Sequence, residues 1–186
     1  MEQIIILSGP PGAGKTSVAE ALCERFDRMV HIEVDDLRAA VKAGYRRPWE
    51  TDRQAVEQIL LSVRNACAIA RESIALRYAV VISDVVTAEV VPLYRAALEG
   101  VGATAHLVTL LPALDVNLAR DATRTTTIPD RVRVLHPELS RDTSSSAIPG
   151  AVLETSGDLD ARMTADRVQD AVSRGTAVFI EREPTP

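Results

Sequence analysis

Runs of apolar residues alternate along the chain with segments in which apolar positions recur every three or four residues. The runs predict strands and the periodic segments predict helices. Two of the runs, Ile4-Ile5-Ile6-Leu7 and Val80-Val81-Ile82, are continuous rather than alternating. Continuous runs are typical of parallel strands that helices cover on both faces. We therefore expect a three-layer α/β/α fold around a five-stranded parallel sheet.

The turn residues between these segments set the expected bounds. Strands are expected at residues 3–7, 29–34, 79–83, 103–111 and 151–155. Helices are expected at residues 15–26, 36–43, 51–76, 88–99, 113–123, 129–139 and 159–174. Thr51 suits an N-cap, Gly100 suits a C-terminal cap, and residues 44–50 and 141–150 look irregular. The pattern fits one domain over residues 1–180, followed by a tail at 181–186.

A glycine-rich motif connects the first expected strand to the first expected helix. It satisfies GxxxxGK[ST] and consists of Gly9, Pro10, Pro11, Gly12, Ala13, Gly14, Lys15 and Thr16, with Ser17 next in the chain. Glycines let the backbone wrap closely around phosphates, and the helix N-terminus attracts their charge. Lys15 supplies a point charge and Thr16 a hydroxyl for Mg²⁺. The motif predicts a nucleoside triphosphate site.

Missing motifs narrow the class of phosphate-loop protein. The sequence contains no Asn-Lys pair, which a guanine-nucleotide switch needs for base recognition, and no LSGGQ-like signature of a transport ATPase. A motor ATPase of the AAA type needs a longer module with a helical lid domain than 186 residues provide. Compact kinases remain, in which an arginine-bearing lid closes over the triphosphate.

Composition favours small acceptors and an intracellular setting. A net charge of −5 argues against a protein whose affinity depends on neutralising many nucleic-acid phosphates. The two cysteines, Cys23 and Cys67, show no metal-ligand spacing, and we interpret them as reduced thiols. No segment matches a signal peptide or a membrane span. We expect a cytoplasmic protein.

Carboxylates and arginines stand where a kinase needs them. Asp35 and Asp36 follow the second expected strand and Asp84 ends the third, so both groups face the phosphate loop at the carboxyl edge of the sheet. Arg120 and Arg124 share one helical face in an expected lid at residues 120–135. Alternatively, the aspartates cap helices and the arginines form surface ion pairs.

With these segments in place, the chain resembles the kinase domain of polynucleotide kinases, and similar arrangements occur in chloramphenicol phosphotransferases and zeta toxins. The resemblance is carried by the phosphate loop and by Val34-Asp35-Asp36-Leu37-Arg38, Ile82-Ser83-Asp84 and Arg120-Asp121-Ala122-Thr123-Arg124 with Ile128-Pro129. It covers residues 3–139 and implies a fold like that of nucleoside-monophosphate kinases.

The resemblance also implies roles for individual residues. Asp35 would be the general base on an acceptor hydroxyl, and Arg38 would hold an acceptor phosphate or the transferring phosphoryl group. Arg120 and Arg124 would clamp the phosphates of ATP. Position in the sequence adds two further expectations: Asp36 could replace Asp35 as the base, and Asp84, at a strand end near the phosphate loop, would assist Thr16 at Mg²⁺.

Departures from the resemblance point away from polynucleotides. Val85-Val86-Thr87 is apolar where polynucleotide kinases carry polar groups, and no phosphatase domain is present. Tyr45, Arg46, Arg47 and Trp49 could stack on an acceptor, or Trp49 could anchor its loop on the core. We expect an ATP-dependent kinase that phosphorylates a hydroxyl of a small molecule. A nucleic-acid 5′-hydroxyl kinase and a non-catalytic ATP-binding protein or NTPase remain the alternatives.

Overall fold

A parallel β-sheet forms the centre of the computed structural model, which describes residues 2–182. The strands are β1 (Gln3–Ser8), β2 (Met29–Glu33), β3 (Ala79–Ser83), β4 (Thr104–Leu110), β5 (Ala151–Leu153) and β6 (Val178–Ile180). The first five are parallel, in the order β2-β3-β1-β4-β5. This confirms the expected three-layer α/β fold.

The strand β6 was missed from the sequence. It is three residues long and pairs antiparallel with the start of β4, whereas β5 pairs with the end of β4. The prediction of a sheet with only five strands is therefore incomplete. So short a strand carries no periodicity of its own, and its pairing is fixed by a partner more than seventy residues earlier.

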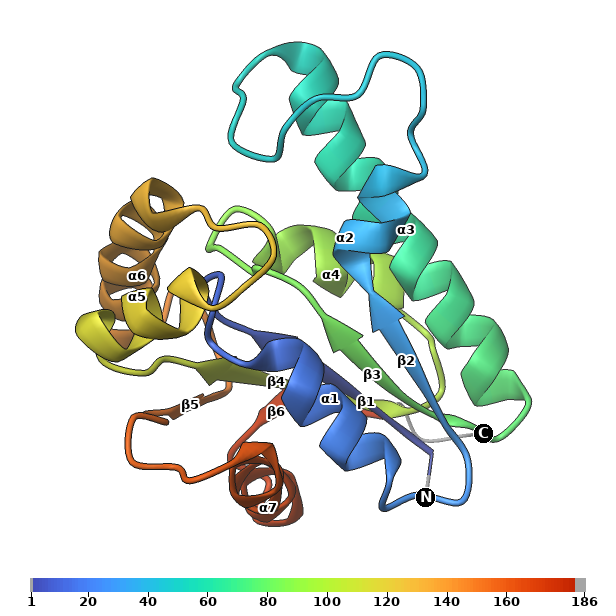
Figure 1. Ribbon diagram of the computed structural model, residues 1–186. Coiled ribbons are helices and arrows are strands. Elements are labelled where there is room, and N and C mark those ends of the chain that lie inside the picture. Colours follow the sequence, from blue (N-terminus) through green and yellow to red (C-terminus); the bar gives the residue numbers. More distant parts are fainter. Residues whose placement is uncertain (1, 183–186) are drawn as a thin grey trace.

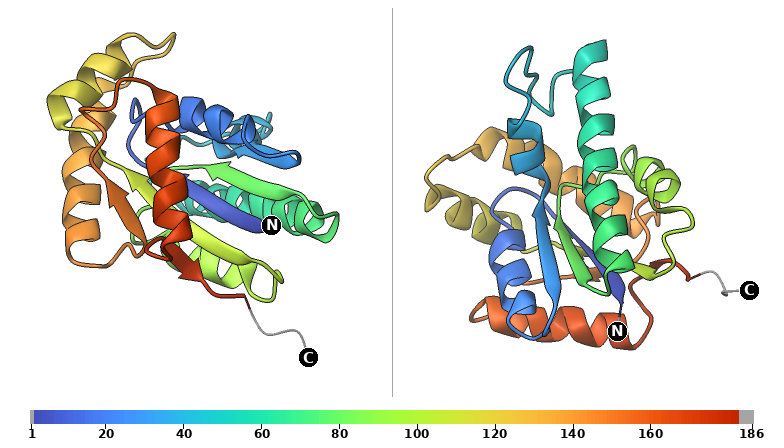
Figure 2. Two further views of the ribbon diagram at one scale, coloured as in Figure 1. Left: turned by 90° about the horizontal axis from the view of Figure 1, so that it is seen from below. Right: turned by 90° about the vertical axis from the view of Figure 1, so that its right-hand side faces the viewer.

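Helices cover both faces of the sheet (Figures 1 and 2). They are α1 (Lys15–Cys23), α2 (Val34–Ala39), α3 (Arg53–Ala75), α4 (Val91–Leu98), α5 (Leu114–Ala122), α6 (Pro129–Ser144) and α7 (Ala161–Ser173). The side chains of β1 show why helices are needed on both faces of the sheet. Ile4 and Ile6 belong to the core beneath α3 and α4, while Ile5 and Leu7 belong to the core beneath α1 and α7. Alternate residues of one strand are thus buried on opposite faces.

Several expected helix bounds differ from the observed ones, and two of the differences involve specific side-chain hydrogen bonds. Asp52, not Thr51, caps α3, because its side chain accepts hydrogen bonds from the backbone N–H groups of Gln54 and Ala55. Helix α6 continues through Ser144 instead of ending near residue 139. Its serine and threonine hydroxyls bond back to helix carbonyls, as Thr143 Oγ1 does to Leu139 O at 2.7 Å, so these side chains satisfy their hydrogen bonds within the helix.

Helix α2 begins at Val34, two residues earlier than expected, and ends at Ala39. Asp35 and Asp36 therefore lie in its first turn, where the helix dipole favours negative charge. The chain then forms a connection over residues 40–52 that projects with the start of α3 beyond the sheet (Figure 1).

The predicted tail falls at the end of the described region. Glu181 and Arg182 are outside any helix or strand, and residues 183–186 lie outside the described residues. No helix within residues 2–182 combines the length and apolar character that crossing a membrane requires.

Candidate active site

The phosphate loop lies between the end of β1 and the start of α1, as the motif predicts. Gly9 has φ +145° and its Cα faces the carbonyl oxygen of Leu110 so closely that a Cβ would collide with it. Gly12 has φ +81°, and a Cβ there would come within 2.9 Å of Asn117. Side chains are excluded at both positions, so the loop depends on glycine for its shape.

Lys15 is directed back into the loop. Its Nζ donates to the carbonyl oxygens of Gly9 at 2.9 Å and Pro10 at 3.2 Å. Burial lowers the pKa of Lys15, while the charges of Asp35 and Glu33 oppose that shift. The ammonium group is therefore held at the centre of the loop by carbonyl groups that a phosphate can replace.

Glu33 is a site residue that the sequence interpretation missed. It ends β2, and its Oε2 accepts a hydrogen bond of 2.8 Å from Thr16 Oγ1. Burial raises the pKa of the Glu33 carboxyl, although the Thr16 hydrogen bond acts against this. A hydroxyl and a carboxylate oxygen are ligands that Mg²⁺ prefers, so this pair fits the metal that the motif implies. Its position at a strand end beside the motif was the available sequence signal.

A chain of hydrogen bonds leads from the cleft into the core. Arg38 Nη1 donates to Asp35 Oδ1 at 2.8 Å, and Nη2 donates to Asp84 Oδ1 at 2.9 Å. Tyr94 Oη donates to Asp84 Oδ2 at 2.9 Å. The exposed fraction of the side chain falls from 72% at Asp35 to 9% at Arg38 and 0% at Asp84. Tyr94, on α4, also went unnoticed in the sequence because only the fold brings it to Asp84.

The hydrogen-bond network indicates different roles for the expected site residues. Burial alone would lower the pKa of Arg38, but the carboxylates of Asp84 and Asp35 outweigh it and raise that pKa. Arg38 is therefore a fixed cation. Asp84 lies behind it and outside the cleft lining, although the sequence suggested that it reaches Mg²⁺ or the water shell of the metal. Asp35 and Asp36 both line the cleft, so both remain candidates for the base.

The expected lid arginines line the same cleft as the phosphate loop. Arg120 Nη2 donates to Thr155 O at 2.9 Å, which joins α5 to the turn after β5. Arg124 pairs with Asp121 at 3.2 Å, and Asp121 also accepts from the backbone N–H of Ile128 at 2.9 Å. The buried Asp121 thus folds residues 121–128 into a compact segment. We call residues 123–128 the lid segment.

Asn117 ties this lid to the phosphate loop. Its side chain is fully buried on α5 and donates through Nδ2 to Pro11 O at 2.5 Å. No local pattern marks this residue, since the contact spans more than a hundred positions. This hydrogen bond holds α5 against the phosphate loop.

These residues enclose one cleft of about 890 Å³. Its lining includes six acidic side chains against three cations. The cations are Lys15, Arg120 and Arg124. Thr16 and Ser17 line it as well, whereas Gly9, Pro10, Arg38 and Asp84 lie behind its surface. A triphosphate at the loop and an acceptor beside Asp35 would therefore share one cavity.

The aromatic and basic cluster at residues 45–49 lies outside this lining. Trp49 is 36% exposed, so it is not a core anchor. Its ring instead has the guanidinium carbons of Arg47 and Arg131 at 5.6 and 5.3 Å from the centroid.

Comparisons with known proteins bear on the family and the fold. A family model described as AAA domain, AAA_33, matches residues 4–145. The tunicamycin resistance protein of Deinococcus radiodurans has a TM-score of 0.67 and 21% identity, covering 97% of this chain and 100% of its own. Shikimate kinase from Acinetobacter baumannii, solved with shikimate, has a TM-score of 0.62 and 21% identity, covering 94% of each chain. A chain of an RNA repair complex has a TM-score of 0.57 and 16% identity, covering 77% of this chain and 46% of its own.

These likenesses show a shared fold. The matched family carries the AAA name, but residues 2–182 include no separate helical domain after the sheet of the kind expected for a motor ATPase. The structural neighbours instead share the compact phosphate-loop kinase fold that the sequence predicted.

Proposed function

We propose, from the premise that the chain belongs to the AAA domain family AAA_33, that it is a kinase transferring the γ-phosphoryl group of ATP to a hydroxyl of a small molecule. One observation carries the proposal. The phosphate loop, the carboxylate of Asp35 and the arginines Arg120 and Arg124 line a single cleft. Phosphoryl transfer needs these three kinds of group together: an anion cradle, a base and cations near the transferred group.

Asp35 is assigned the role of base. Its side chain is 72% exposed to the cleft, and Arg38 holds one carboxylate oxygen at 2.8 Å, which leaves Oδ2 free to accept the acceptor's proton. Asp36, on the same turn of α2, is the alternative. Arg38 is itself fixed by Asp84 at 2.9 Å, so the carboxylate of Asp35 is oriented before an acceptor arrives.

The cations act on the nucleotide side. Lys15 and the amides of the phosphate loop hold the β and γ phosphates, and Arg120 and Arg124 neutralise charge on the transferring group. Bound Mg²⁺ would offset phosphate charge during transfer. Thr16 would hold the metal, and Glu33 takes the supporting position that the sequence suggested for Asp84, because Glu33 already contacts Thr16 at 2.8 Å.

The acidic lining favours a small acceptor over a nucleic acid. The three cations of the lining, Lys15, Arg120 and Arg124, are assigned to the triphosphate, so within the described part of the chain the lining offers no further cation to a nucleic-acid backbone beside the acidic helix turn, and the net charge of −5 is unfavourable as well. The tunicamycin resistance protein and the shikimate kinase are named for small molecules, which is consistent with this proposal.

A transfer screen tests the proposal. The protein is incubated with γ-labelled ATP, Mg²⁺ and either a panel of hydroxylated small molecules or 5′-hydroxyl oligonucleotides. We expect label in one small-molecule class. Label only in the oligonucleotides would identify a nucleic-acid kinase. Nucleotide binding and slow hydrolysis without any labelled acceptor would identify an NTPase.

Two matched variants assign the base. Asp35→Asn should lower acceptor phosphorylation by about a hundredfold or more while nucleotide affinity is retained. Asp36→Asn, one residue along the same helix turn, should retain most of the activity. The reverse result would move the base to Asp36.

A further inference from the structure

A tryptophan–arginine contact joins the two sides of the cleft outside the residues that line it. Trp49 belongs to the connection between α2 and α3, and Arg131 lies in the first turn of α6. The guanidinium carbon of Arg131 is 5.3 Å from the centroid of the Trp49 ring. This distance is within the range of a cation–π interaction.

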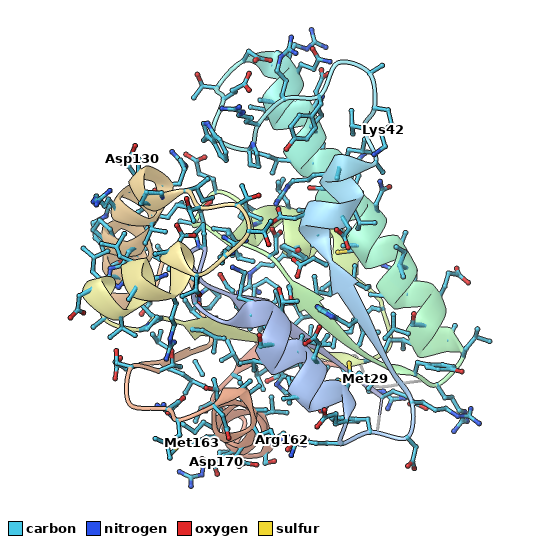
Figure 3. The ribbon with its side chains drawn as sticks, viewed as in Figure 1. Met29, Lys42, Asp130, Arg162, Met163 and Asp170 are labelled. Atoms are coloured by element: carbon cyan, nitrogen blue, oxygen red, sulfur yellow. The ribbon has the colours of Figure 1, made fainter. Side chains whose placement is uncertain are left out.

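The two partners continue the two walls of the cleft. One wall includes Asp35 and Asp36 on α2, and Trp49 lies in the connection that follows this helix. The other wall includes Arg124 and Ile128 of the lid segment, which leads directly into α6. Figure 3 labels Lys42 at the start of the α2–α3 connection and Asp130 at the N-terminal end of α6, and both lie on the upper side of that view. The contact therefore links the wall that carries Asp35, where the acceptor would bind, to the wall that carries the lid segment.

The ring of Trp49 is the partner that the fold provides for Arg131. Within residues 2–182 no carboxylate lies within 4.0 Å of the Arg131 guanidinium, and Arg131 Nε is buried without a hydrogen-bond partner. The neighbouring Asp130 pairs with Arg133 instead, at 3.1 Å. A guanidinium that is partly removed from water interacts more strongly with an aromatic face than an exposed one does.

We propose that Trp49 and Arg131 are positioning residues that hold the lid segment above the phosphate loop. Neither lines the cleft, so they act through Arg124 and Ile128. Asn117 and Asp121 hold this segment on the α5 side, Asp121 by accepting from the Ile128 N–H, and the Trp49 contact holds the start of α6 that follows it. Fixing both ends in advance reduces the ordering that nucleotide binding must impose. The proposal rests on the proposed nucleotide site and is independent of the acceptor.

A double-mutant cycle on nucleotide affinity tests the contact. The probe is a non-hydrolysable ATP analogue with Mg²⁺, and the variants are Trp49→Leu, Arg131→Gln and their combination, measured by calorimetry. Each single change should lower nucleotide affinity about two- to fivefold. Because both changes break the same contact, the double variant should bind as tightly as the single variant with the lower affinity. Arg133→Gln, on the same helix but away from the ring, is the matched control and should bind like wild type.

Fluorescence gives a second, independent readout, because Trp49 is the single tryptophan of the chain. Arg131→Gln should shift its emission without ligand. In wild type the analogue should change the emission although it does not touch Trp49, and in Arg131→Gln this change should be lost while calorimetry still detects binding. Arg47→Gln, which removes the stack within the connection only, should retain the response to the analogue.

The outcomes separate this proposal from the proposed function. Wild-type protein that binds no nucleotide would remove both. Normal nucleotide binding with unchanged affinity in Trp49→Leu and Arg131→Gln, or with fully additive losses, would overturn the positioning role alone. Unfolding of Trp49→Leu, seen by circular dichroism, leaves Arg131→Gln and its emission as the deciding measurement.

Discussion

At the scale of single residues, the site depends on a buried hydrogen bond far from the cleft surface. Tyr94 is fully buried, and burial raises the pKa of its hydroxyl well above the ordinary value, so it donates to Asp84 as a neutral group. Asp84 in turn holds Arg38 at 2.9 Å. The orientation of Arg38, and through it that of Asp35, is therefore fixed from within the core.

Tyr94→Phe tests this dependence. The change keeps the ring but removes the donor to Asp84, so we expect a loss of about 1–3 kcal/mol in the free energy of unfolding, measured by urea denaturation. We also expect kcat to fall about threefold to tenfold with little change in nucleotide affinity, because Arg38 loses its fixed orientation. Tyr78→Phe, on a half-exposed ring, is the control and should change neither quantity. An unaltered kcat in Tyr94→Phe would exclude a positioning role for the network.

Glu33 gives a prediction for pH dependence. Burial raises the pKa of its carboxyl above the ordinary 4.5, so ionised Glu33 destabilises the folded state near neutral pH. Because the folded state binds its proton more tightly than the unfolded state does, this cost disappears as pH falls through the raised pKa to below 4.5. Glu33→Gln keeps an oxygen that can accept from Thr16, and it should be more stable than wild type at pH 7.

Urea titrations at several pH values check the Glu33 prediction. The stability difference between Glu33→Gln and wild type should shrink as pH decreases and vanish below pH 4.5. A difference that is constant with pH would show that Glu33 is not the titrating group. In an activity assay the same variant should need more Mg²⁺ for half-maximal turnover, because Thr16 loses its neighbouring carboxylate.

At the scale of helices and strands, local signals succeeded where the determining contacts are short in sequence. The phosphate loop, the strand β3 and the starts of α1 and α6 were predicted correctly, since the motif, a continuous apolar run and a proline at the first helical turn encode them directly. The end of α6 and the existence of β6 were not. The serine-rich end of α6 resembles a loop in sequence although its hydroxyls bond to helix carbonyls, and β6 pairs with a distant strand.

The candidate site divides in the same way. Lys15, Asp35, Arg120 and Arg124 stand in short motifs, and the fold brings them to one cleft. Tyr94 and Asn117 join the site only through contacts that the fold makes, and Glu33 offered only its position at a strand end, which many residues without a site role share.

The N-cap of α3 can be tested, because Thr51 was expected and Asp52 is observed. Asp52 Oδ1 accepts from the N–H groups of Gln54 at 2.9 Å and Ala55 at 3.1 Å, so Asp52→Ala should lower the free energy of unfolding by about 1 kcal/mol. Thr51→Ala should leave it unchanged. Asp52→Asn keeps a capping oxygen while removing the ion pair with Arg46, so it should retain most of the stability. Urea midpoints that fall for Thr51→Ala but not for Asp52→Ala would contradict the observed cap.

At the scale of the whole molecule, the nucleotide site joins the two cores of the domain. The phosphate loop leads from β1 into α1, which packs on α7 on one face, while the Arg38–Asp84–Tyr94 network enters the core beneath α3 and α4 on the other. A ligand held at the loop therefore lies between elements that pack into both cores. Binding should therefore stabilise the domain as a unit.

This stabilisation provides a test that needs no knowledge of the acceptor. With Mg²⁺ and a non-hydrolysable ATP analogue at about one hundred times its Kd, the free energy of unfolding should rise by about 2.7 kcal/mol, seen as a single shifted urea transition. Lys15→Met removes the buried ammonium group at the centre of the loop, so the increase should be lost although the unliganded protein remains folded. Asp35→Asn leaves the loop intact and should retain the full increase. If the analogue stabilised Lys15→Met as much as wild type, the ligand would be bound elsewhere, and the assignment of the phosphate site itself would be wrong.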